Sequence, residues 1–450
     1  MPSDRSQSPE GVNLLFGLSL DDFVASAWEN ESVGEDLPVL DPQQQPKTEL
    51  SVHPRRQLYQ SDTDVDGHED DFRLAYACSG YCTPSGKVHR PPVRLVDVGA
   101  RGIGMIAAHA IPRGQVLYTE KAAVATQTAS SVRACQACFR SMETIDACCD
   151  SSNKHPLPHP ELWPVVPDRH EECPDCGALF CSVYCQREFV ASYDTCCGLA
   201  RSISALDVIL EPPIEAAVVL AVRTFWMELS QLRRIGTWKE EFFGLCGSSD
   251  DIRTLEIGVR IDTGYTLQPV YDMLVQETNL TPDEQTFLSL DHLQGLVAKA
   301  ARNGVSLWTQ SPFKSYYAAL QRQASRGTEK YDNLISEVAQ ALGSPKLQRG
   351  MDQLVEERVA PHVAALFPLT ARINHDCAPN AEIQSQVFVD AHLDLVATKD
   401  IAQGEEITIT YVSGRNKQGR RKALWAHYLF HCECSTCSST QEPPQPRHPS

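Results

Sequence analysis

Two stretches in the C-terminal part of the chain decide the fold: Ile373-Asn-His-Asp-Cys-Ala-Pro-Asn380 and Gly404-Glu-Glu-Ile-Thr-Ile-Thr-Tyr411. The first places an Asn-His pair ahead of a Cys and a Pro-Asn turn, which is unusual in a plain connecting loop. The second is a turn that feeds an alternating strand and delivers a tyrosine at its end. A strand-end tyrosine or a single histidine is, by itself, more often a packed core residue. The hypothesis of a functional site therefore depends on the two stretches occurring together.

A third stretch, Gly99-Ala-Arg101-Gly102-Ile-Gly104, lies far upstream. Glycines allow backbone amides and carbonyls to come close to a ligand. Taken alone, such a run is more commonly a turn between two strands. It becomes informative as the first of three stretches that end at Tyr411.

The spacing of apolar residues predicts an α+β protein. Short β-branched or alternating runs predict strands over 93–98, 106–111, 116–127, 381–390, 393–398 and 406–412. Between them a helical period predicts helices over 214–233, 282–303, 313–323, 329–342 and 351–366, and a last helix over 417–429. Strands at both ends of the region indicate one β domain interrupted by insertions.

Eleven of the 17 cysteines have metal-ligand spacing. Eight of them lie in a segment, residues 135–200, that carries too few apolar residues for a core of its own: Cys135, Cys138, Cys173, Cys176, Cys181, Cys185, Cys196 and Cys197. Two pairs complete one tetrahedral ion, so this segment predicts two zinc ions. The remaining three, Cys432, Cys434 and Cys437, form a further cluster that is one ligand short.

We interpret these cysteines as zinc ligands because no signal peptide is visible, which predicts a cytoplasmic or nuclear protein with reduced thiols. The longest apolar run, 214–229, is interrupted by Glu215, Arg223 and Glu228, so we expect a packed helix and no membrane association. The net charge of −18 belongs mainly to residues 1–71, which hold 16 acidic and 4 basic residues.

Direct nucleic acid binding is not expected. A nucleic-acid finger needs clustered Lys and Arg to neutralise phosphates. Residues 135–200 hold four basic residues against ten acidic ones. A structural or peptide-docking role suits this segment better, and a zinc transcription factor is excluded on charge.

Together, the glycine, Asn-His and tyrosine stretches resemble the SET-domain lysine methyltransferases. The paired cysteines inserted after the first strands resemble a MYND zinc finger, and the combination resembles the SET-and-MYND family. The run Leu157-Pro-His-Pro-Glu-Leu162 and the long first gap of the finger look most like a divergent member of that family. The resemblance covers roughly residues 92–200 and 366–437.

This resemblance implies a SET-domain β fold interrupted by a MYND-like zinc finger and a helical block, and closed by a post-SET zinc cluster. The expected divisions run from an acidic disordered tail to a Pro-rich tail. They are 1–90 for the acidic tail, 91–134 for the first SET part, 135–200 for the finger, 201–365 for the helical insertion, 366–415 for the catalytic SET part, 416–437 for the post-SET helix and cluster, and 438–450 for the last tail.

The same resemblance implies S-adenosylmethionine as the cofactor and assigns site residues. Tyr411 would stand at the methyl-transfer point. The cofactor would be lined by Arg101, Gly102 and Gly104, held by Asn374 and His375, and stacked near its adenine by Phe430.

For the metals, the resemblance implies three zinc ions. The interleaved pairs of the finger would give one ion Cys135, Cys138, Cys181 and Cys185, and the other Cys173, Cys176 and Cys197. Tyr193 stands where the family has a histidine, so the fourth ligand of the second ion is left open between Cys196, Asp194 and His170. Cys377 would complete the third cluster.

The expected activity is methylation of a lysine in a protein substrate, a histone tail or another protein. The alternative is a non-enzymatic adaptor, with a peptide-binding finger and an inert SET fold. A degenerate enzyme would be expected to lose the tyrosine or the Asn-His pair first. Both are present, as Tyr411 and Asn374-His375, which favours an enzyme.

Overall fold

The structure is a computed structural model that describes residues 91–438 and the short strands at 81–82 and 88–89, with gaps inside that range. The gaps are residues 129–131, 146–155, 211–214, 237–244, 254, 256–266, 310, 328–329, 343–358, 386–391 and 413–415. Both predicted tails lie outside the described residues, except for residue 438 and for the paired strands at 81–82 and 88–89, which fall within the division predicted as the acidic tail.

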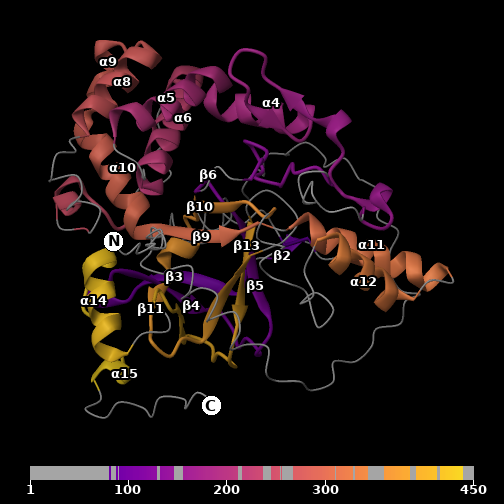
Figure 1. Ribbon diagram of the computed structural model, residues 1–450. Helices are drawn as coiled ribbons and strands as arrows, with labels where there is room; N and C mark the ends of the chain where they lie inside the picture. The colour runs from indigo at the N-terminus through magenta and orange to yellow at the C-terminus, as the bar shows by residue number, and fades with distance from the viewer. Residues whose placement is uncertain are drawn as a thin grey trace, which may run out of the picture.

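The strands come from both halves of the chain (Figure 1). They are β1 (Tyr81–Cys82), β2 (Val88–His89), β3 (Val93–Asp97), β4 (Ile103–Ala107), β5 (Val116–Lys121), β6 (Val124–Gln127), β7 (Glu171–Glu172), β8 (Leu179–Phe180), β9 (Gly304–Trp308), β10 (His362–Leu366), β11 (Asn374–His375), β12 (Ala381–Ser385), β13 (His392–Ala397) and β14 (Glu406–Ile409).

The α-helices fill the middle and the end of the chain. They are α4 (Val183–Tyr193), α5 (Cys196–Ile209), α6 (Ala216–Ile235), α8 (Gln268–Thr278), α9 (Pro282–Phe287), α10 (Leu290–Asn303), α11 (Pro312–Arg326), α12 (Tyr331–Ala341), α14 (Lys417–Tyr428) and α15 (Ser435–Ser438).

Three small sheets form the β core, and each one joins distant parts of the sequence. Their strand orders are β11-β14-β4-β3, β12-β13-β5 and β6-β10-β9. In Figure 1, α5, α6, α8, α9 and α10 gather on one side of this core, while α11 and α12 lie at its far edge. The helical insertion thus leaves the β core after β6 and returns to it through β9 and β10.

The parallel pairing of β11 with β14 matters most for the site. Asn374 pairs with Thr408 and His375 with Ile409. The remaining neighbour of β14 is β4, which pairs with it in the antiparallel sense and places Glu406 opposite Ile106. One short sheet therefore brings the Asn-His stretch, the glycine stretch and the end of β14 together.

A compact apolar core holds these sheets. Met105, Tyr118, Phe367, Leu393 and Ile407 are at most 2 % exposed and belong to one cluster. Burying one apolar side chain of this size contributes about 1.5–3 kcal/mol to folding. A second, larger cluster joins the cysteine-rich segment to α5, α6, α8 and α10, so the finger has no separate core.

A buried carboxylate fixes the turn that leads into β11. Glu120 on β5 accepts hydrogen bonds from the backbone N–H groups of Leu369 and Thr370, at 2.7 and 2.8 Å, and from the Thr370 hydroxyl at 2.6 Å. Burial raises the pKa of Glu120 to about 7, and these donors act against that rise. The carboxylate satisfies the backbone donors of a turn that would otherwise be buried without partners.

The predicted elements are largely present, with one error of type. The helix predicted over 351–366 is wrong at its C-terminal end, because residues 362–366 form β10. All five residues of β10 are buried, so the strand lacks the alternation that distinguishes a half-exposed strand from a buried helix. The rest of that predicted helix, up to residue 358, lies outside the described residues.

Other differences concern boundaries. The helix predicted over 282–303 divides into α9 and α10, because Ser289 caps a new helix by accepting a hydrogen bond from the His292 N–H. The strand predicted over 116–127 divides into β5 and β6, and the strand predicted over 106–111 is found three residues earlier. The prediction contained no counterpart of the helices α4, α5, α8 and α15 or of the short strands β1, β2, β7, β8, β9 and β11.

The longest helix, α6, carries Arg223 and Glu228 as buried charges. Among the described residues, no helix is both long enough and apolar enough to cross a membrane.

Candidate active site and metal centres

The structure gathers twelve cysteines into three groups of four. In each group the four sulfurs lie within 4.8 Å of one another. The tetrads are Cys135, Cys138, Cys181 and Cys185; Cys173, Cys176, Cys196 and Cys197; and Cys377, Cys432, Cys434 and Cys437.

Sulfur separations in the tetrads suit a tetrahedral metal ion. Zinc–sulfur bonds of about 2.3 Å place two ligand sulfurs about 3.8 Å apart. The Sγ–Sγ distances are 3.6 Å for Cys138–Cys181, 3.5 Å for Cys173–Cys197 and 3.9 Å for Cys377–Cys432. These separations are far longer than the roughly 2.05 Å of a disulfide bond. Each tetrad could therefore hold one zinc ion.

Short local motifs build the first tetrad. Cys181 lies two residues before α4 begins at Val183, and Cys185 lies in the first turn of that helix. Ser182 caps the helix by accepting a hydrogen bond from the Cys185 N–H at 3.3 Å. This cap orients both thiols toward the loop that carries Cys135 and Cys138.

The second tetrad answers the question that the sequence left open. Its fourth member is Cys196, while His170 and Asp194 are not part of the group. Cys196 and Cys197 are the first residues of α5. Gly198 allows that helix to lie against α6, since a Cβ at Gly198 would lie 2.5 Å from the Trp226 ring.

Arg223 of α6 fixes the finger to the helical block. Its guanidinium lies 5.6 Å from the Phe139 ring and 5.9 Å from the rings of Phe189 and Tyr193. It also donates to Gln136 Oε1 at 3.0 Å. The tyrosine at the family's histidine position therefore packs on a cation and does not contribute a ligand.

The third tetrad is coupled to the Asn-His stretch through His375. The imidazole Nδ1 accepts a hydrogen bond from the Tyr411 N–H at 3.0 Å, and Nε2 lies 3.3 Å from Cys377 Sγ. Burial lowers the pKa of His375 to about 4, so its ring is neutral at pH 7. Because Nδ1 is an acceptor, the proton of the neutral ring is on Nε2 and is donated to the sulfur.

These contacts use both ring nitrogens of His375. The side chain is 6 % exposed, and both ring nitrogens have protein partners. The two ring nitrogens therefore hold Cys377 and the Tyr411 backbone, and contact between His375 and the cofactor stays a prediction.

Tyr411 lies where strand β14 ends, and its hydroxyl donates to the carbonyl of Ile373 at 2.5 Å. Burial raises the pKa of Tyr411, so its hydroxyl stays protonated at neutral pH. Its ring lies 4.7 Å from Tyr428 and 6.1 Å from Phe430, measured between centroids. Phe430, predicted beside the cofactor, also lies 6.0 Å from His375. Tyr411, the residue predicted at the methyl-transfer point, thus packs against the aromatic rings of Tyr428 and Phe430.

Around strands β4, β11 and β14, three predicted residues meet a fourth that the sequence reasoning missed. Glu406 pairs with Arg101 and accepts from Asn374 Nδ2 at 3.0 Å. Gly104 makes this possible, since a Cβ there would lie 2.9 Å from Asn374 Nδ2 and 3.1 Å from Glu406 Oε1. The only signal in the sequence was the Gly-Glu-Glu turn that precedes the strand.

Gly102 has φ 72° and ψ −143°, a conformation that favours glycine. Nothing lies within 4 Å of the position that its Cβ would take. The backbone at Gly102 therefore faces open space beside Arg101.

Sequence comparisons agree with this geometry. The SET domain family matches residues 102–412. The protein-lysine N-trimethyltransferase SMYD5 of Danio rerio is 25 % identical over 391 residues, covering 80 % of this chain and 90 % of the relative. The human SMYD5 protein is 26 % identical over 378 residues, covering 78 % and 87 %. A SET and MYND domain-containing protein of Dictyostelium discoideum is 45 % identical over 74 residues, covering 16 % and 21 %.

The β core, the interrupting finger and the tyrosine site define a methyltransferase of the SET type, and the chain belongs to the SET-domain family. Within that family it is a divergent SET-and-MYND protein-lysine methyltransferase, similar to the SMYD5 proteins.

Proposed function

We propose that this chain transfers a methyl group from S-adenosylmethionine to the side-chain amine of a lysine in a protein substrate, a histone or another protein. The observation that carries the proposal is the position of the Tyr411 hydroxyl, held against the Ile373 carbonyl beside the Asn374-His375 pair. Two of the relatives are named as protein-lysine N-trimethyltransferases, which supports a protein lysine as the substrate.

The residues near Gly102 fit the amino-acid end of this cofactor. Asn374 uses its Nδ2 to donate to Glu406, so its Oδ1 is directed away from the carboxylate and suits an ammonium group. Arg101 has five N–H donors, of which only some face Glu406, and the others suit a carboxylate. When bound, S-adenosylmethionine supplies an electrophilic methyl group on its sulfonium.

The chain's own residues prepare the lysine. A lysine must be neutral to act as a nucleophile, and an apolar environment lowers its pKa. The rings of Tyr428 and Phe430 beside Tyr411 provide such an environment. The protonated Tyr411 hydroxyl and nearby carbonyls can orient the amine without forming a covalent bond.

We also propose that each cysteine tetrad holds one zinc ion. The sulfur separations support this, and none of the twelve thiols lies at disulfide distance. The ions would have structural roles, because each group offers four protein ligands and leaves no open position.

Calorimetry with S-adenosylmethionine and zinc-loaded full-length protein tests the cofactor assignment. Wild type should bind and the Asn374→Ala variant should bind at least about tenfold more weakly. His375→Ala is a poor probe, because loss of its ring disturbs the Cys377 and Tyr411 contacts. Absence of binding by folded, zinc-replete wild type would contradict the proposal and support the adaptor function.

Transfer to protein is tested with a labelled methyl donor, cell extract as a source of substrates, and Tyr411→Phe as the catalytic control. Label should appear on lysine and should depend on Tyr411. Mass spectrometry of the labelled protein identifies the lysine and counts the methyl groups. Label on any other residue type would contradict the assignment of lysine.

A further inference from the structure

Helix α14 is amphipathic, and its outer face carries features that the methyltransferase site does not use. Ala423, Leu424 and Tyr428 are buried, and Tyr428 contacts Tyr411 on the inner side. The exposed residues of the helix recur three and four positions apart: Gln418, Arg421, Lys422 and Trp425. We call these four residues, with His431, the post-SET outer face.

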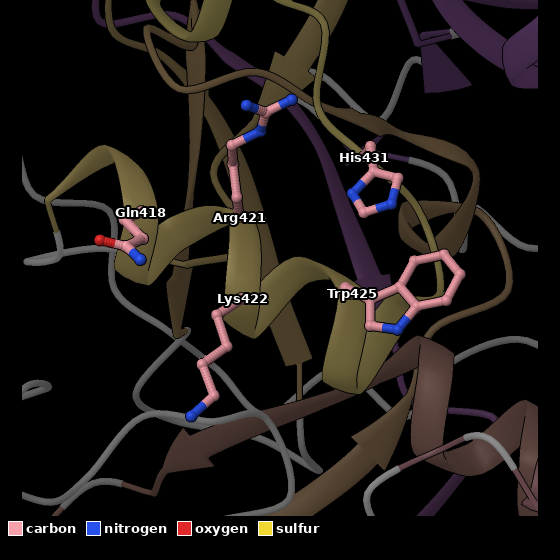
Figure 2. A pocket seen from close by; sticks show the side chains of 5 residues that line it. All are labelled: Gln418, Arg421, Lys422, Trp425 and His431. Carbon is pink, nitrogen blue, oxygen red and sulfur yellow. The ribbon is translucent and has the colours of Figure 1, made fainter.

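This face forms a shallow open pocket with a volume of about 370 Å³ (Figure 2). Trp425 is 45 % exposed, and its ring stacks on His431 with 4.7 Å between centroids and an interplanar angle of 7°. Figure 2 shows the Arg421 side chain extending toward the His431 side of the pocket. An exposed tryptophan held flat by a neighbour offers a rigid apolar contact for a partner.

The charge of residues 413–432 indicates the kind of partner that the post-SET outer face would bind. Residues 413–432 contain five Lys or Arg residues and no Asp or Glu, in a chain whose net charge is −18. Among the described residues, no ion pair involves Arg421 or Lys422. Two adjacent cations without acidic partners, beside an apolar platform, suit an acidic segment that carries apolar side chains.

A lysine-bearing substrate segment does not fit this face. Its positive charge would be repelled by Arg421 and Lys422, and the residues that line the pocket do not include Tyr411 or the aromatic residues Tyr428 and Phe430 that pack on it. The post-SET outer face is therefore an additional surface, separate from the lysine site.

The chain itself contains a segment with the complementary composition. Residues 6–46 include eight Asp or Glu residues and no Lys or Arg. Apolar anchors are interspersed with these acids, notably Leu15, Phe16, Phe23 and Trp28. We propose that the post-SET outer face binds the acidic segment of residues 14–36 of the same chain.

Chain length permits this contact. The continuous description begins at residue 91, so the 55 residues after residue 36 can span up to about 180 Å at roughly 3.3 Å per residue. Tethering raises the effective concentration of the segment to the order of millimolar, so weak contacts suffice for binding. Intramolecular binding is thus favoured over capture of a dilute partner with similar chemistry.

The test places the photo-crosslinking amino acid benzoylphenylalanine at Gln418 of full-length, zinc-loaded protein. Cross-linked peptides are then identified by mass spectrometry. A mixture of ¹⁵N-labelled and unlabelled chains distinguishes contacts within a copy from contacts between copies. Same-copy cross-links from position 418 to residues 14–36 are expected.

Charge reversal supplies the specificity control. Arg421→Glu with Lys422→Glu should lower the cross-link yield by roughly fivefold or more, and adding Asp21→Lys with Asp22→Lys should restore most of it. Arg326→Glu with Lys330→Glu, two exposed cations on α11 and next to α12, should leave the yield unchanged. All four cations are exposed, so these variants should retain zinc and circular dichroism like wild type.

Three outcomes would overturn the proposal. Mixed-isotope cross-links would assign the face to a second copy of the chain. Cross-links confined to other residues, or an absence of cross-links by folded protein, would remove residues 14–36 as the occupant. A yield unaffected by the charge reversal would show that the contact does not depend on the cations.

Discussion

His375 connects the third cysteine tetrad to Tyr411: its Nε2 lies 3.3 Å from Cys377 Sγ, and its Nδ1 accepts from the Tyr411 backbone N–H at 3.0 Å. A hydrogen bond from a neutral imidazole to a thiolate is stronger than one to a thiol. Zinc at this tetrad would hold Cys377 as a thiolate and thereby fix the orientation of the ring. The position of Tyr411 would then depend on metal binding at the third tetrad, through His375.

Removal of one ligand from this tetrad should therefore weaken the methyltransferase site. We expect Cys437→Ser to reduce bound zinc from three ions to two. It should also weaken S-adenosylmethionine binding by about 10- to 100-fold, a loss of the size seen when contacts that support metal ligands are removed. Metal analysis and calorimetry provide the two measurements. Cys246→Ser is the matched control, because Cys246 is exposed and belongs to none of the tetrads. Loss of one ion with unchanged cofactor affinity would show that the tetrad and the site are independent.

Tyr411→Phe separates chemistry from packing. The ring would keep its contacts with Tyr428 and Phe430, while the hydrogen bond to the Ile373 carbonyl is lost. We expect the single-turnover rate to fall by roughly 10²- to 10³-fold, comparable to the loss of one preorganised donor. Cofactor affinity should stay within about twofold, because the phenylalanine still fills the same space. An unchanged rate would remove Tyr411 from the catalytic role.

Glu406 positions Asn374 and Arg101, and its substitution should affect cofactor binding more than turnover. We expect Glu406→Ala to raise the KM for S-adenosylmethionine by about tenfold with kcat within about threefold, since it leaves Asn374 Nδ2 without its partner. Glu406→Gln should be milder, because it retains an acceptor for Asn374.

The adjacent Glu405 is the control for Glu406. It accepts from Asn380 Nδ2 and from the Ala402 N–H, each within 3.0 Å, and does not contact Asn374. We expect Glu405→Gln to change stability and to leave the KM for the cofactor unchanged. Equal effects of both substitutions on KM would show that Glu406 acts through general loss of structure.

The local chemistry of this protein could be predicted from its sequence, whereas contacts across long separations could not. Metal spacing identified eleven of the twelve tetrad cysteines, because pairs such as Cys135 and Cys138 are close in sequence, whereas Cys377 came from the family resemblance. The choice of Cys196 over His170 and Asp194 required the start of α5, which periodicity did not locate. Glu406 was missed because its partner Arg101 is 305 positions away, and the Gly-Glu-Glu turn alone does not show which carboxylate pairs with the glycine stretch.

The error at residues 362–366 has a related cause. This segment is central in its sheet, between β6 and β9, and is buried on both faces. Such a strand has no exposed side to produce alternation, so its apolar run matches a helix equally well. The pairing of residue 363 with Gln127 and Leu307 decides the structure, and that information is not local.

Substitution of two glycines by alanine tests how much space surrounds the backbone, at Gly104 in the site and at Gly295 away from it. Gly104→Ala should weaken cofactor binding by about tenfold or more, because its Cβ would lie 2.9 Å from both Asn374 Nδ2 and Val98 Cγ2. Gly295 lies inside α10, and nothing lies within 4 Å of its would-be Cβ. Gly295→Ala should raise stability by about 0.5–1 kcal/mol, measured by urea unfolding. Normal cofactor binding by Gly104→Ala would contradict the close approach described above.

His362 predicts a pH dependence of stability that one substitution can isolate. It lies on β10, 8 % exposed, with Nδ1 2.5 Å from the Thr128 hydroxyl, and burial lowers its pKa from 6.5 to about 4. Above pH 6.5 the imidazole is neutral in the folded and unfolded chains. As the pH falls from 6.5 toward 4, the unfolded chain binds a proton that the folded chain does not, so this residue makes folding less favourable.

Glu120 has the opposite effect over part of this range. Its pKa is raised from 4.5 to about 7, so the folded chain retains a proton that the unfolded chain has lost, and stability falls as the pH rises through that window. Comparison with His362→Asn, which keeps an acceptor near Thr128, removes the Glu120 contribution because both proteins contain it. Between pH 7.5 and 5.5 the wild type should lose about 1.4 kcal/mol more unfolding free energy than the variant. Parallel losses in urea titrations at the two pH values would show that His362 has the same pKa in the folded and unfolded states.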